Sequence, residues 1–347
     1  MKHLIMYTAV FLLFLFLSAE IKSDPAFYIP EYWPKPVYDF SQNPLSKEKF
    51  ELGRTLFYDP DLSRDSTISC ANCHLQYSGF THIDHALSHG IDGKIGTRNS
   101  PVLVNLAWQS YFHWDGGVSS LNKQAINPLT HAKEMDNSLT EIIRRLNSSS
   151  YYQGRFYRAF GDSLVETSSL LKALASFSVS LVSANSKYDR VQRGEAQFTQ
   201  QEQSGSLLFE KFCASCHKPP LFMKNDFKSN GIPIDPKLMD MGRMGITQRS
   251  QDSLLFKIPS LRNIEFSFPY MHDGRFKQLK DVLAHYGQLH EKETYYSKEL
   301  KKLRSGLNSN EQKDLIAFLK TLSDQAFLFN PAFKYPKDER NTHHPKK

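Results

Sequence analysis

Apolar residues recur at helical spacing in several parts of the chain, and no stretch sustains the two-residue alternation of a β-strand. In one stretch, Leu171, Leu174 and Leu181 form an apolar stripe along a single face. The pattern predicts an all-α fold whose helices are joined by long loops rich in glycine and proline. The helices that it indicates cover residues 47–57, 139–160, 169–183 and 200–212.

Two of these predicted helices carry a glycine near their middle, at Gly53 and Gly205. Glycine inside a helix costs about 1 kcal/mol relative to alanine. The absence of a side chain is useful where another helix or a flat ring must come close. We therefore expect a close neighbour at both positions.

The first residues of the chain predict a signal peptide. Lys2 is followed by a mostly apolar run over residues 4–19 and then by polar residues. This run is shorter than the roughly 20 residues that span a membrane. Residues 1–23 are therefore interpreted as a secretory signal peptide, with an uncleaved N-terminal anchor as the alternative. At the other end, residues 335–347 form a basic tail.

The composition is ordinary for a soluble globular protein, with 40% hydrophobic residues and a net charge of +7. The positive charges are scattered, and no basic helix or patch interleaved with aromatic residues argues for nucleic-acid binding. The chain between leader and tail is long enough for two domains. We place them at residues 24–185 and 186–334.

All four cysteines of the chain lie in two copies of the motif Cys-x-x-Cys-His. Two thiols at this spacing can bond to the two vinyl groups of one porphyrin, and the histidine can ligate its iron. Zinc binding and structural disulfides are alternatives, but zinc sites usually have compact spacing and each pair here has its own histidine. We expect two covalently bound c-type haems, held by Cys70, Cys73 and His74 and by Cys213, Cys216 and His217.

The similarity between the two motifs extends in both directions. The helix before each motif carries Gly-x-x-Leu-Phe, and the segment after each motif repeats a proline, an asparagine and an aspartate at the same offsets. A match of this length indicates a tandem duplication of one haem-binding unit. The downstream positions are Pro101, Asn105 and Asp115 in the first copy and Pro259, Asn263 and Asp273 in the second.

The two copies differ where a second axial ligand would stand. Each iron takes its motif histidine on one side, and the group on the other side decides between electron transfer and chemistry. A predicted helix in the second copy offers His285 or Tyr286, whereas the matching position of the first copy is Pro128, which cannot ligate. We therefore expect the first iron to be open on one side.

The first copy instead carries Gln124 and Glu134. Heterolysis of a peroxide needs a group that takes a proton from one oxygen and delivers it to the other. A carboxylate beside an open iron can do this, with an amide nearby to hydrogen-bond the bound oxygen. The plain alternative for Glu134 is a solvated surface acid.

Three further short sequences stand out, Arg98-Asn-Ser-Pro101, Trp114-Asp-Gly116 and Pro269-Tyr-Met-His-Asp-Gly274. Together with the haem motifs, they resemble the bacterial di-haem cytochrome c peroxidase family from about residue 47 to residue 322. The resemblance implies two tandem cytochrome c-like domains with the active site between them. His74 would be the proximal ligand of the peroxidatic haem and His217 that of the electron-transfer haem, and Trp114 would relay electrons between them.

The resemblance also implies groups around the haems. Gln124 and Glu134 would line the distal pocket of the first haem. A calcium ion at the domain interface would be held by the side chain of Asn99 and the backbone carbonyls of Ser267 and Pro269. Three neutral oxygens completed by waters suit a hard cation.

Other positions indicate which branch of this family the chain resembles. Where peroxidases served by small cytochromes have methionine as the second axial ligand, counting from Pro269 leads to Tyr286. This resembles the branch whose enzyme matures tryptophan tryptophylquinone in methylamine dehydrogenase, and a phenolate ligand lowers the potential of the iron. Gly117 stands where the family commonly has arginine. In some members a loop histidine caps the first iron, a role that would fall here on His85 or His89.

We therefore expect a periplasmic enzyme that reduces hydrogen peroxide with electrons from a small donor protein, a cytochrome c or a cupredoxin. One alternative, favoured by Tyr286, is a peroxide-driven oxidase of residues on a partner protein. Another is a di-haem electron carrier or redox sensor without catalysis. A homodimer is compatible with the sequence.

Overall fold

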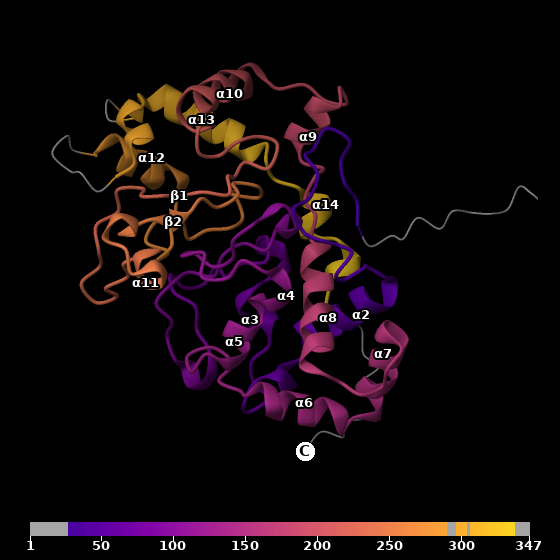
Figure 1. Ribbon diagram of the computed structural model, residues 1–347. Coiled ribbons are helices and arrows are strands. Elements are labelled where there is room, and N and C mark those ends of the chain that lie inside the picture. Colours follow the sequence, from indigo (N-terminus) through magenta and orange to yellow (C-terminus); the bar gives the residue numbers. More distant parts are fainter. Residues whose placement is uncertain (1–26, 290–295, 304–305, 337–347) are drawn as a thin grey trace, which may run out of the picture.

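The computed structural model describes residues 27–289, 296–303 and 306–336, so the predicted signal peptide and most of the basic tail lie outside the described residues. The described part is mainly helical, as the apolar pattern predicted (Figure 1). The strands that it contains are β1 (Phe227–Lys228) and β2 (Phe256–Lys257), which pair antiparallel.

The longer helices are α2 (Lys47–Phe57), α6 (Leu139–Asn147), α7 (Ser150–Phe160), α8 (Thr167–Val179), α10 (Gln200–Phe212), α12 (Leu279–Gly287) and α13 (Ser309–Lys320). The shorter ones are α3 (Cys70–Cys73), α4 (Leu121–Gln124), α5 (Ile126–Thr130), α9 (Lys187–Gln192), α11 (Met244–Thr247) and α14 (Gln325–Leu328).

Two crossed helix pairs organise the molecule, α2 with α8 in the lower part of Figure 1 and α10 with α13 in the upper part. A Cβ atom at Gly53 would overlap the carbonyl oxygen of Ala173 on α8, and one at Gly205 would overlap that of Asp314 on α13. Both glycines therefore let a second helix come close, which confirms that expectation. Because the two copies solve the crossing in the same way, the repeat seen in the sequence is also a repeat in structure.

The end of the chain packs into the hydrophobic core around α2 and α8, here called the first core. Phe327 of α14 lies 5.8 Å from Phe80, and Phe333 lies 6.4 Å from Phe177, measured between ring centroids. Leu328 is buried in the same cluster. The second core gathers instead around α10 and α13. The first core is therefore completed by residues that follow the second copy.

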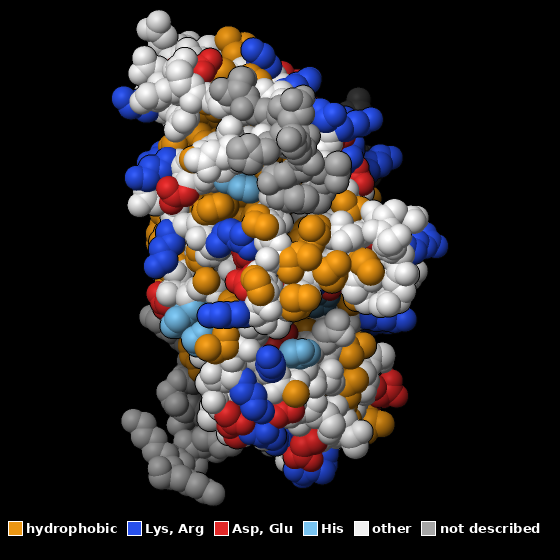
Figure 2. Space-filling view, turned by 90° about the vertical axis from the view of Figure 1, so that its left-hand side faces the viewer, with side chains coloured by type: hydrophobic (Ala, Val, Ile, Leu, Met, Phe, Trp, Pro, Cys, Tyr) orange, Lys and Arg blue, Asp and Glu red, His pale blue; other side chains and the backbone are white. Residues whose placement is uncertain are grey.

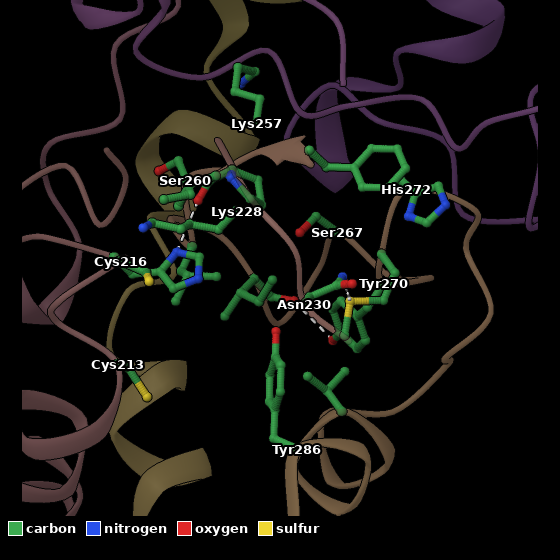
Figure 3. A pocket seen from close by; sticks show the side chains of 18 of the residues that line it. Cys213, Cys216, Lys228, Asn230, Lys257, Ser260, Ser267, Tyr270, His272 and Tyr286 are labelled. Carbon is green, nitrogen blue, oxygen red and sulfur yellow. Dashed lines mark hydrogen bonds between the residues drawn. The ribbon is translucent and has the colours of Figure 1, made fainter. Parts of the chain in front are cut away.

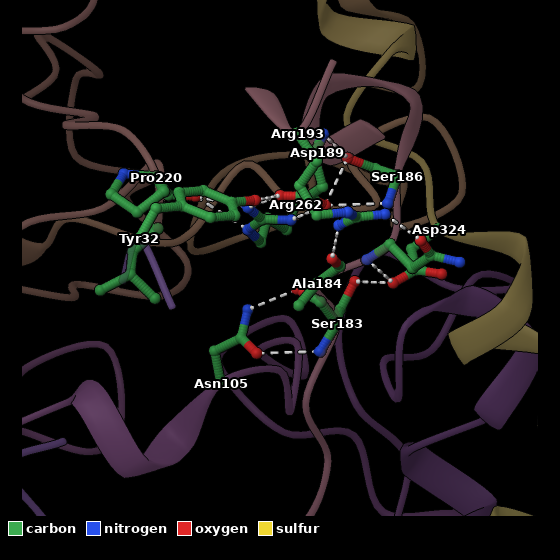
Figure 4. A network of polar contacts seen from close by, with 12 residues as sticks. Tyr32, Asn105, Ser183, Ala184, Ser186, Asp189, Arg193, Pro220, Arg262 and Asp324 are labelled. Carbon is green, nitrogen blue, oxygen red and sulfur yellow. Dashed lines mark hydrogen bonds and ion pairs between the residues drawn. The ribbon is translucent and has the colours of Figure 1, made fainter. Parts of the chain in front are cut away.

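A polar network joins the copies at their pseudo-equivalent asparagines, and Figure 4 shows the part of it around Asn105 and Ser183. The side chain of Asn105 accepts from the backbone N–H of Ser183 at 2.9 Å and donates to its carbonyl at 3.2 Å. Asn263 accepts from the backbone N–H of Asp324 at 2.8 Å and donates to the Ser183 hydroxyl at 3.0 Å. Ser183 is thus the point at which the matched asparagines of both copies meet.

A buried ion pair lies beside this network. Both Arg262 and Asp189 have fully buried side chains, and the guanidinium donates to the carboxylate at 2.7 and 2.8 Å. The remaining donors of Arg262 reach the carbonyl of Pro220. Removing one partner of such a pair costs about 3–5 kcal/mol because the other charge stays buried.

Helix ends agree with the sequence where side chains cap them. The predicted bounds 47–57 and 200–212 are those of α2 and α10, whose caps are Ser46 and Thr199. The predicted helical stretch 139–160 divides instead into α6 and α7, because the Ser148 hydroxyl bonds back to the chain and the next residue is extended. The helix expected over 169–183 runs from Thr167 to Val179 as α8.

One face of the molecule combines hydrophobic side chains with both signs of charge. Figure 2 shows it from the side that lies to the left in Figure 1, with the hydrophobic groups gathered near the middle. Exposed apolar residues between β1 and β2 are Ile234, Met239 and Ile246. Within the described ranges, no helix is both long and apolar enough to cross a bilayer.

Candidate functional site

Each Cys-x-x-Cys-His motif forms one helical turn. The backbone N–H of His74 donates to the carbonyl of Cys70 at 3.0 Å, and that of His217 donates to the carbonyl of Cys213 at 2.9 Å. A bond from residue i to residue i−4 closes one turn of helix and brings the ends of the motif to the same side. In both copies the two thiols and the imidazole therefore border one cavity.

Both imidazoles are held in the form that binds a metal. Nδ1 of His74 lies 2.7 Å from the carbonyl oxygen of Phe80, and Nδ1 of His217 lies 3.1 Å from that of Pro259. A carbonyl only accepts, so Nδ1 carries the proton and Nε2 keeps its lone pair. Burial lowers the pKa of both imidazoles to about 4, so both are neutral at pH 7.

The cavity beside the first motif, here called the His74 cavity, has a volume of about 70 Å³. Gln124 and Glu134 line it together with the first motif, so the structure brings these predicted residues to one place. Pro128, at the position that matches Tyr286, also lines it and has no group that could ligate iron. This cavity therefore has an imidazole, an amide and a carboxylate around it.

Glu134 is placed to hold and release a proton. Its side chain keeps 42% of its surface open and borders the His74 cavity. Its backbone carbonyl is fixed by the N–H of Ile91 at 2.8 Å. Desolvation by the surrounding protein raises the pKa of its carboxyl, and the nearby His131 opposes that shift. A carboxyl with a raised pKa is a better proton donor near neutral pH than an ordinary surface acid.

The cavity beside the second motif, here called the His217 cavity, is larger, at about 210 Å³. Tyr286 extends from α12 into it, as Figure 3 shows, and lines it together with His217. His285 points elsewhere, because its Nε2 lies 2.8 Å from the carbonyl oxygen of Asn230. The sequence left either residue open as the second ligand, and this orientation favours Tyr286. Burial raises the pKa of the phenol, a shift that a coordinated cation would reverse.

The His217 cavity also contains a cation that sequence reasoning missed. Lys257 is buried, and its ammonium donates to Gln109 Oε1 at 2.9 Å. An amide does not balance the charge, and burial lowers the pKa of Lys257 to about 8. A buried ammonium that borders a cavity fits an anionic group of a ligand, such as a haem propionate. The sequence does not reveal the burial of Lys257, because its partner Gln109 is distant in the chain.

Trp114 belongs to the first copy but lines the His217 cavity. Its indole N–H donates to the carbonyl of Asn99 at 2.8 Å, and its own carbonyl accepts from the N–H of Lys257 at 2.7 Å. Trp114 is therefore fixed from both copies. The Asn99 side chain lies 2.9 Å from the carbonyl oxygen of Pro269, and Ser267 borders the same cavity. The structure thus brings together the three residues expected to bind calcium.

The donor sets of both cavities fit a haem. Each has two thiols and a neutral imidazole beside an apolar hollow, and the second adds a phenol and a buried ammonium. Among the described residues, no group of three or more acidic, histidine or cysteine side chains is arranged to hold another metal ion.

Comparison with known proteins agrees with these donor sets. A family model described as di-haem cytochrome c peroxidase matches residues 47–197. The methylamine utilization protein MauG of Methylophilus methylotrophus is 34% identical over 317 residues, which cover 89% of this chain and 91% of that protein. The chain belongs to the di-haem cytochrome c peroxidase family. As a member of this family it is an oxidoreductase of the di-haem peroxidase type.

Other relatives of this family match over most of the chain. Cytochrome c551 peroxidase of Nitrosomonas europaea is 32% identical over 298 residues, which cover 84% of each protein. The crystal structure of a MauG-like protein associated with microbial copper homeostasis superposes with a TM-score of 0.80 and 31% identity, covering 89% of this chain and 99% of that one. The family therefore joins relatives named as peroxidases with relatives named MauG.

The structure shows what accompanies the departure from the family at Gly117. In the second copy, Arg275 after the Asp-Gly pair donates to Asp273 at 2.8 Å. The first copy has Gly117 at the matching position, and Asp115 is instead bonded by Arg98. A cation from an earlier loop therefore takes the place of the missing arginine beside this aspartate.

The loop histidines of this di-haem peroxidase form a stack. The ring centroids of His82 and His85 lie 5.2 Å apart, and those of His85 and His89 lie 4.1 Å apart. The described residues that line the His74 cavity include the adjacent Gly90 but none of these imidazoles. The capping role expected for His85 or His89 stays a prediction.

Proposed function

We propose that the chain is an exported, periplasmic di-haem peroxidase that reduces hydrogen peroxide to water, with one haem attached covalently at each motif. The main observation behind the proposal is that the two cavities are lined by different polar side chains. Glu134 and Gln124 border the His74 cavity, where Pro128 replaces a second ligand. Tyr286 borders the His217 cavity on the side of α12.

Haem iron, when bound, supplies the electrons and the Lewis acidity that break an oxygen–oxygen bond. The residues of the His74 cavity supply the proton transfers. Glu134 would accept a proton from hydrogen peroxide and return it to the oxygen that leaves as water. The amide of Gln124 holds the bound peroxide in line by a hydrogen bond. His74 ligates through Nε2 while Phe80 holds its other nitrogen.

The His217 cavity would store charge rather than bind substrate. His217 and Tyr286 would hold the second haem, and a phenolate would stabilise its oxidised iron. Trp114 carries electrons between the two cavities. A calcium ion held by Asn99, Ser267 and Pro269 would fix the loop that contains Asn99. Trp114 would be fixed with it, because its indole N–H donates to the carbonyl of Asn99. External electrons come from a small donor protein, a cytochrome c or a cupredoxin.

Electron paramagnetic resonance of the haem-loaded protein tests this assignment. One haem open on one side gives a high-spin ferric signal, and the tyrosine-ligated haem gives a low-spin signal. Addition of hydrogen peroxide should remove the high-spin signal and consume peroxide when a reduced donor is present. Two low-spin signals, both at rest and after half-reduction, would contradict the proposal and favour an electron carrier.

A second candidate function is peroxide-driven oxidation of residues on a partner protein. Tyr286 favours it, because a low-potential second haem is a poor acceptor of electrons from a high-potential cytochrome. The mixed face of Figure 2 also suits a transient protein contact, since such interfaces combine apolar groups with charges. Peroxide-dependent oxidation of a reduced cytochrome and of candidate partner proteins, measured side by side, separates the two functions.

A further inference from the structure

Three oxidisable aromatic residues form a continuous line from the interior to the surface. The ring centroids of Trp108 and Trp33 are 4.9 Å apart, and those of Trp33 and Tyr32 are 6.5 Å apart. Trp108 and Trp33 are 2% and 6% exposed, whereas Tyr32 is 37% exposed. Exposure therefore rises along the line in one direction.

The N-terminal lead of the chain is tied down so that this line is rigid. The indole N–H of Trp108 donates to the carbonyl of Pro34 at 2.7 Å. The backbone N–H groups of Val37 and Tyr38 both donate to the carbonyl of Ala107 at 2.9 Å. These contacts fix the lead directly after Tyr32 and Trp33.

The inner end of the line touches the walls of both haem cavities. Trp108 packs in one cluster with Leu121 and Ala175, which line the His74 cavity. Its chain neighbour Gln109 lines the His217 cavity and accepts from Lys257. Trp108 therefore shares a cluster with residues that line the His74 cavity and a peptide bond with one that lines the His217 cavity.

The outer end of the line has a proton acceptor. The Tyr32 hydroxyl donates to Asp189 Oδ1 at 2.6 Å, an arrangement shown in Figure 4. Arg262 lies 4.6 Å from the Trp33 ring and by itself would oppose a positive charge there. Its ion pair with Asp189 offsets that effect, since the two groups are paired at 2.7 Å. Loss of an electron from Tyr32 can therefore be coupled to transfer of its proton.

We propose that Trp108, Trp33 and Tyr32 conduct oxidising equivalents to the surface, and that Tyr32 is a second substrate site at which small phenols are oxidised. This inference rests on the proposed peroxidase function. An electron passes inward from Tyr32 through Trp33 and Trp108, and the Tyr32 proton moves to Asp189. A phenol then returns an electron to Tyr32, Asp189 returns the proton, and the proton of the phenol enters solvent. Two phenols thus supply the two electrons and two protons that convert one peroxide into two waters.

The test uses the haem-loaded protein, hydrogen peroxide and a nitroso spin trap without any donor, followed by peptide mass spectrometry. Trapped label is expected on Tyr32. Trp33→Phe should lower that label at least tenfold, whereas Trp33→Tyr, which restores an oxidisable ring, should recover it. Guaiacol oxidation should fall about tenfold in Tyr32→Phe, while peroxide reduction with a reduced cytochrome stays unchanged.

Tyr157 on α7 provides the matched control, because it is 62% exposed and stands outside the line. Tyr157→Phe should change neither the labelling of Tyr32 nor guaiacol oxidation. Wild-type labelling of Tyr32 in folded Trp33→Phe, or equal labelling of Tyr157 in the wild type, overturns the inference and leaves the peroxidase assignment standing. A wild-type haem spectrum that does not respond to peroxide overturns both.

Discussion

The two cavities belong to two copies of one duplicated unit, yet different side chains line them. Both have a Cys-x-x-Cys-His turn and a neutral imidazole fixed by a backbone carbonyl. The His74 cavity adds Gln124 and Glu134, and the His217 cavity adds the phenol of Tyr286 and the buried ammonium of Lys257. The shared parts attach and orient a cofactor, and the parts that differ set what the cofactor can do.

The two cavities differ at one matched position of the repeat. There the first copy has Pro128 and the second has Tyr286. A group that could ligate iron is thus present at this position in one copy and absent in the other, while the helix crossings at Gly53 and Gly205 are the same in both copies. Duplication followed by divergence at the ligand shell is the simplest account of this pattern.

The largest expected effect comes from removing the proton carrier of the His74 cavity. Glu134→Gln should slow peroxide cleavage by roughly 10²- to 10⁴-fold, because the amide cannot shuttle a proton. The absorption spectra of both haems should stay nearly the same. Stopped-flow mixing with hydrogen peroxide measures the rate.

Glu195→Gln is the control for this change, since Glu195 is an exposed acid bonded to Arg193 and lies outside both cavities. It should keep the wild-type rate. Turnover by Glu134→Gln that equals that of the control would remove Glu134 from the mechanism and weaken the contrast between the cavities.

The second change makes the ligand of the His217 cavity resemble that of the cytochrome-linked peroxidases. Tyr286→Met should raise the reduction potential of one haem by on the order of a few hundred millivolts, within the range that axial ligands span. Only one of the two haems should respond in a spectroelectrochemical titration.

His285→Ala is the matched variant, because His285 is the adjacent residue and bonds the backbone of Asn230. Its haem potentials should stay close to those of the wild type. If His285→Ala shifts the potential and Tyr286→Met does not, the two residues exchange roles.

The third change tests whether the helix crossings of the two copies contribute equally to the stability of the fold. Gly53→Ala and Gly205→Ala should each destabilise the protein by about 1–3 kcal/mol, since a methyl group would overlap a helix backbone in both places. Urea unfolding measures the change in the free energy of unfolding.

Gly154 in α7 is the control glycine, because a Cβ there would have no neighbour within 4 Å. Gly154→Ala should stabilise the protein by up to about 1 kcal/mol through helix propensity. A neutral result at Gly53 or Gly205 would show that the helix crossing is looser in that copy.

The smallest effect is a pH dependence specific to the His74 cavity. The pKa of Glu134 is raised by burial, and peroxide cleavage needs its ionised form to accept a proton. The rate should therefore fall as pH falls through that raised pKa, at a higher pH than an ordinary glutamate would give. The residual rate of Glu134→Gln should lack this acid limb. An acid limb that persists in the variant would assign the titration to another group.

The sequence predicted the parts of this molecule that depend on local rules. The bounds of α2 and α10 followed from apolar spacing, and Ser46 and Thr199 fix where those helices begin by capping their N-termini. The chemistry of peroxide cleavage singled out Gln124 and Glu134 in the sequence, and the structure places both beside the first motif. The break between α6 and α7 was missed, since the apolar spacing continues across it.

Tertiary contacts decided what the sequence could not. The choice between His285 and Tyr286 depends on where a backbone carbonyl, that of Asn230, stands in the folded chain. The hydrogen bond from Lys257 to Gln109 joins segments that are distant in sequence, and the bond from Arg98 to Asp115 joins two separate loops. No periodicity or motif encodes such contacts, which is why the buried ammonium of Lys257 in the His217 cavity appeared only in the structure.

The burial of Phe327, Leu328 and Phe333 in the first core has a consequence for how the protein is made. The residues of the first copy are synthesised first, but their core stays incomplete until α14 and Phe333 have followed. A chain cut short after residue 324 would lose several large buried side chains, at about 3–5 kcal/mol for each aromatic group. The half that would handle peroxide can therefore reach its stable form only in a chain that has been finished.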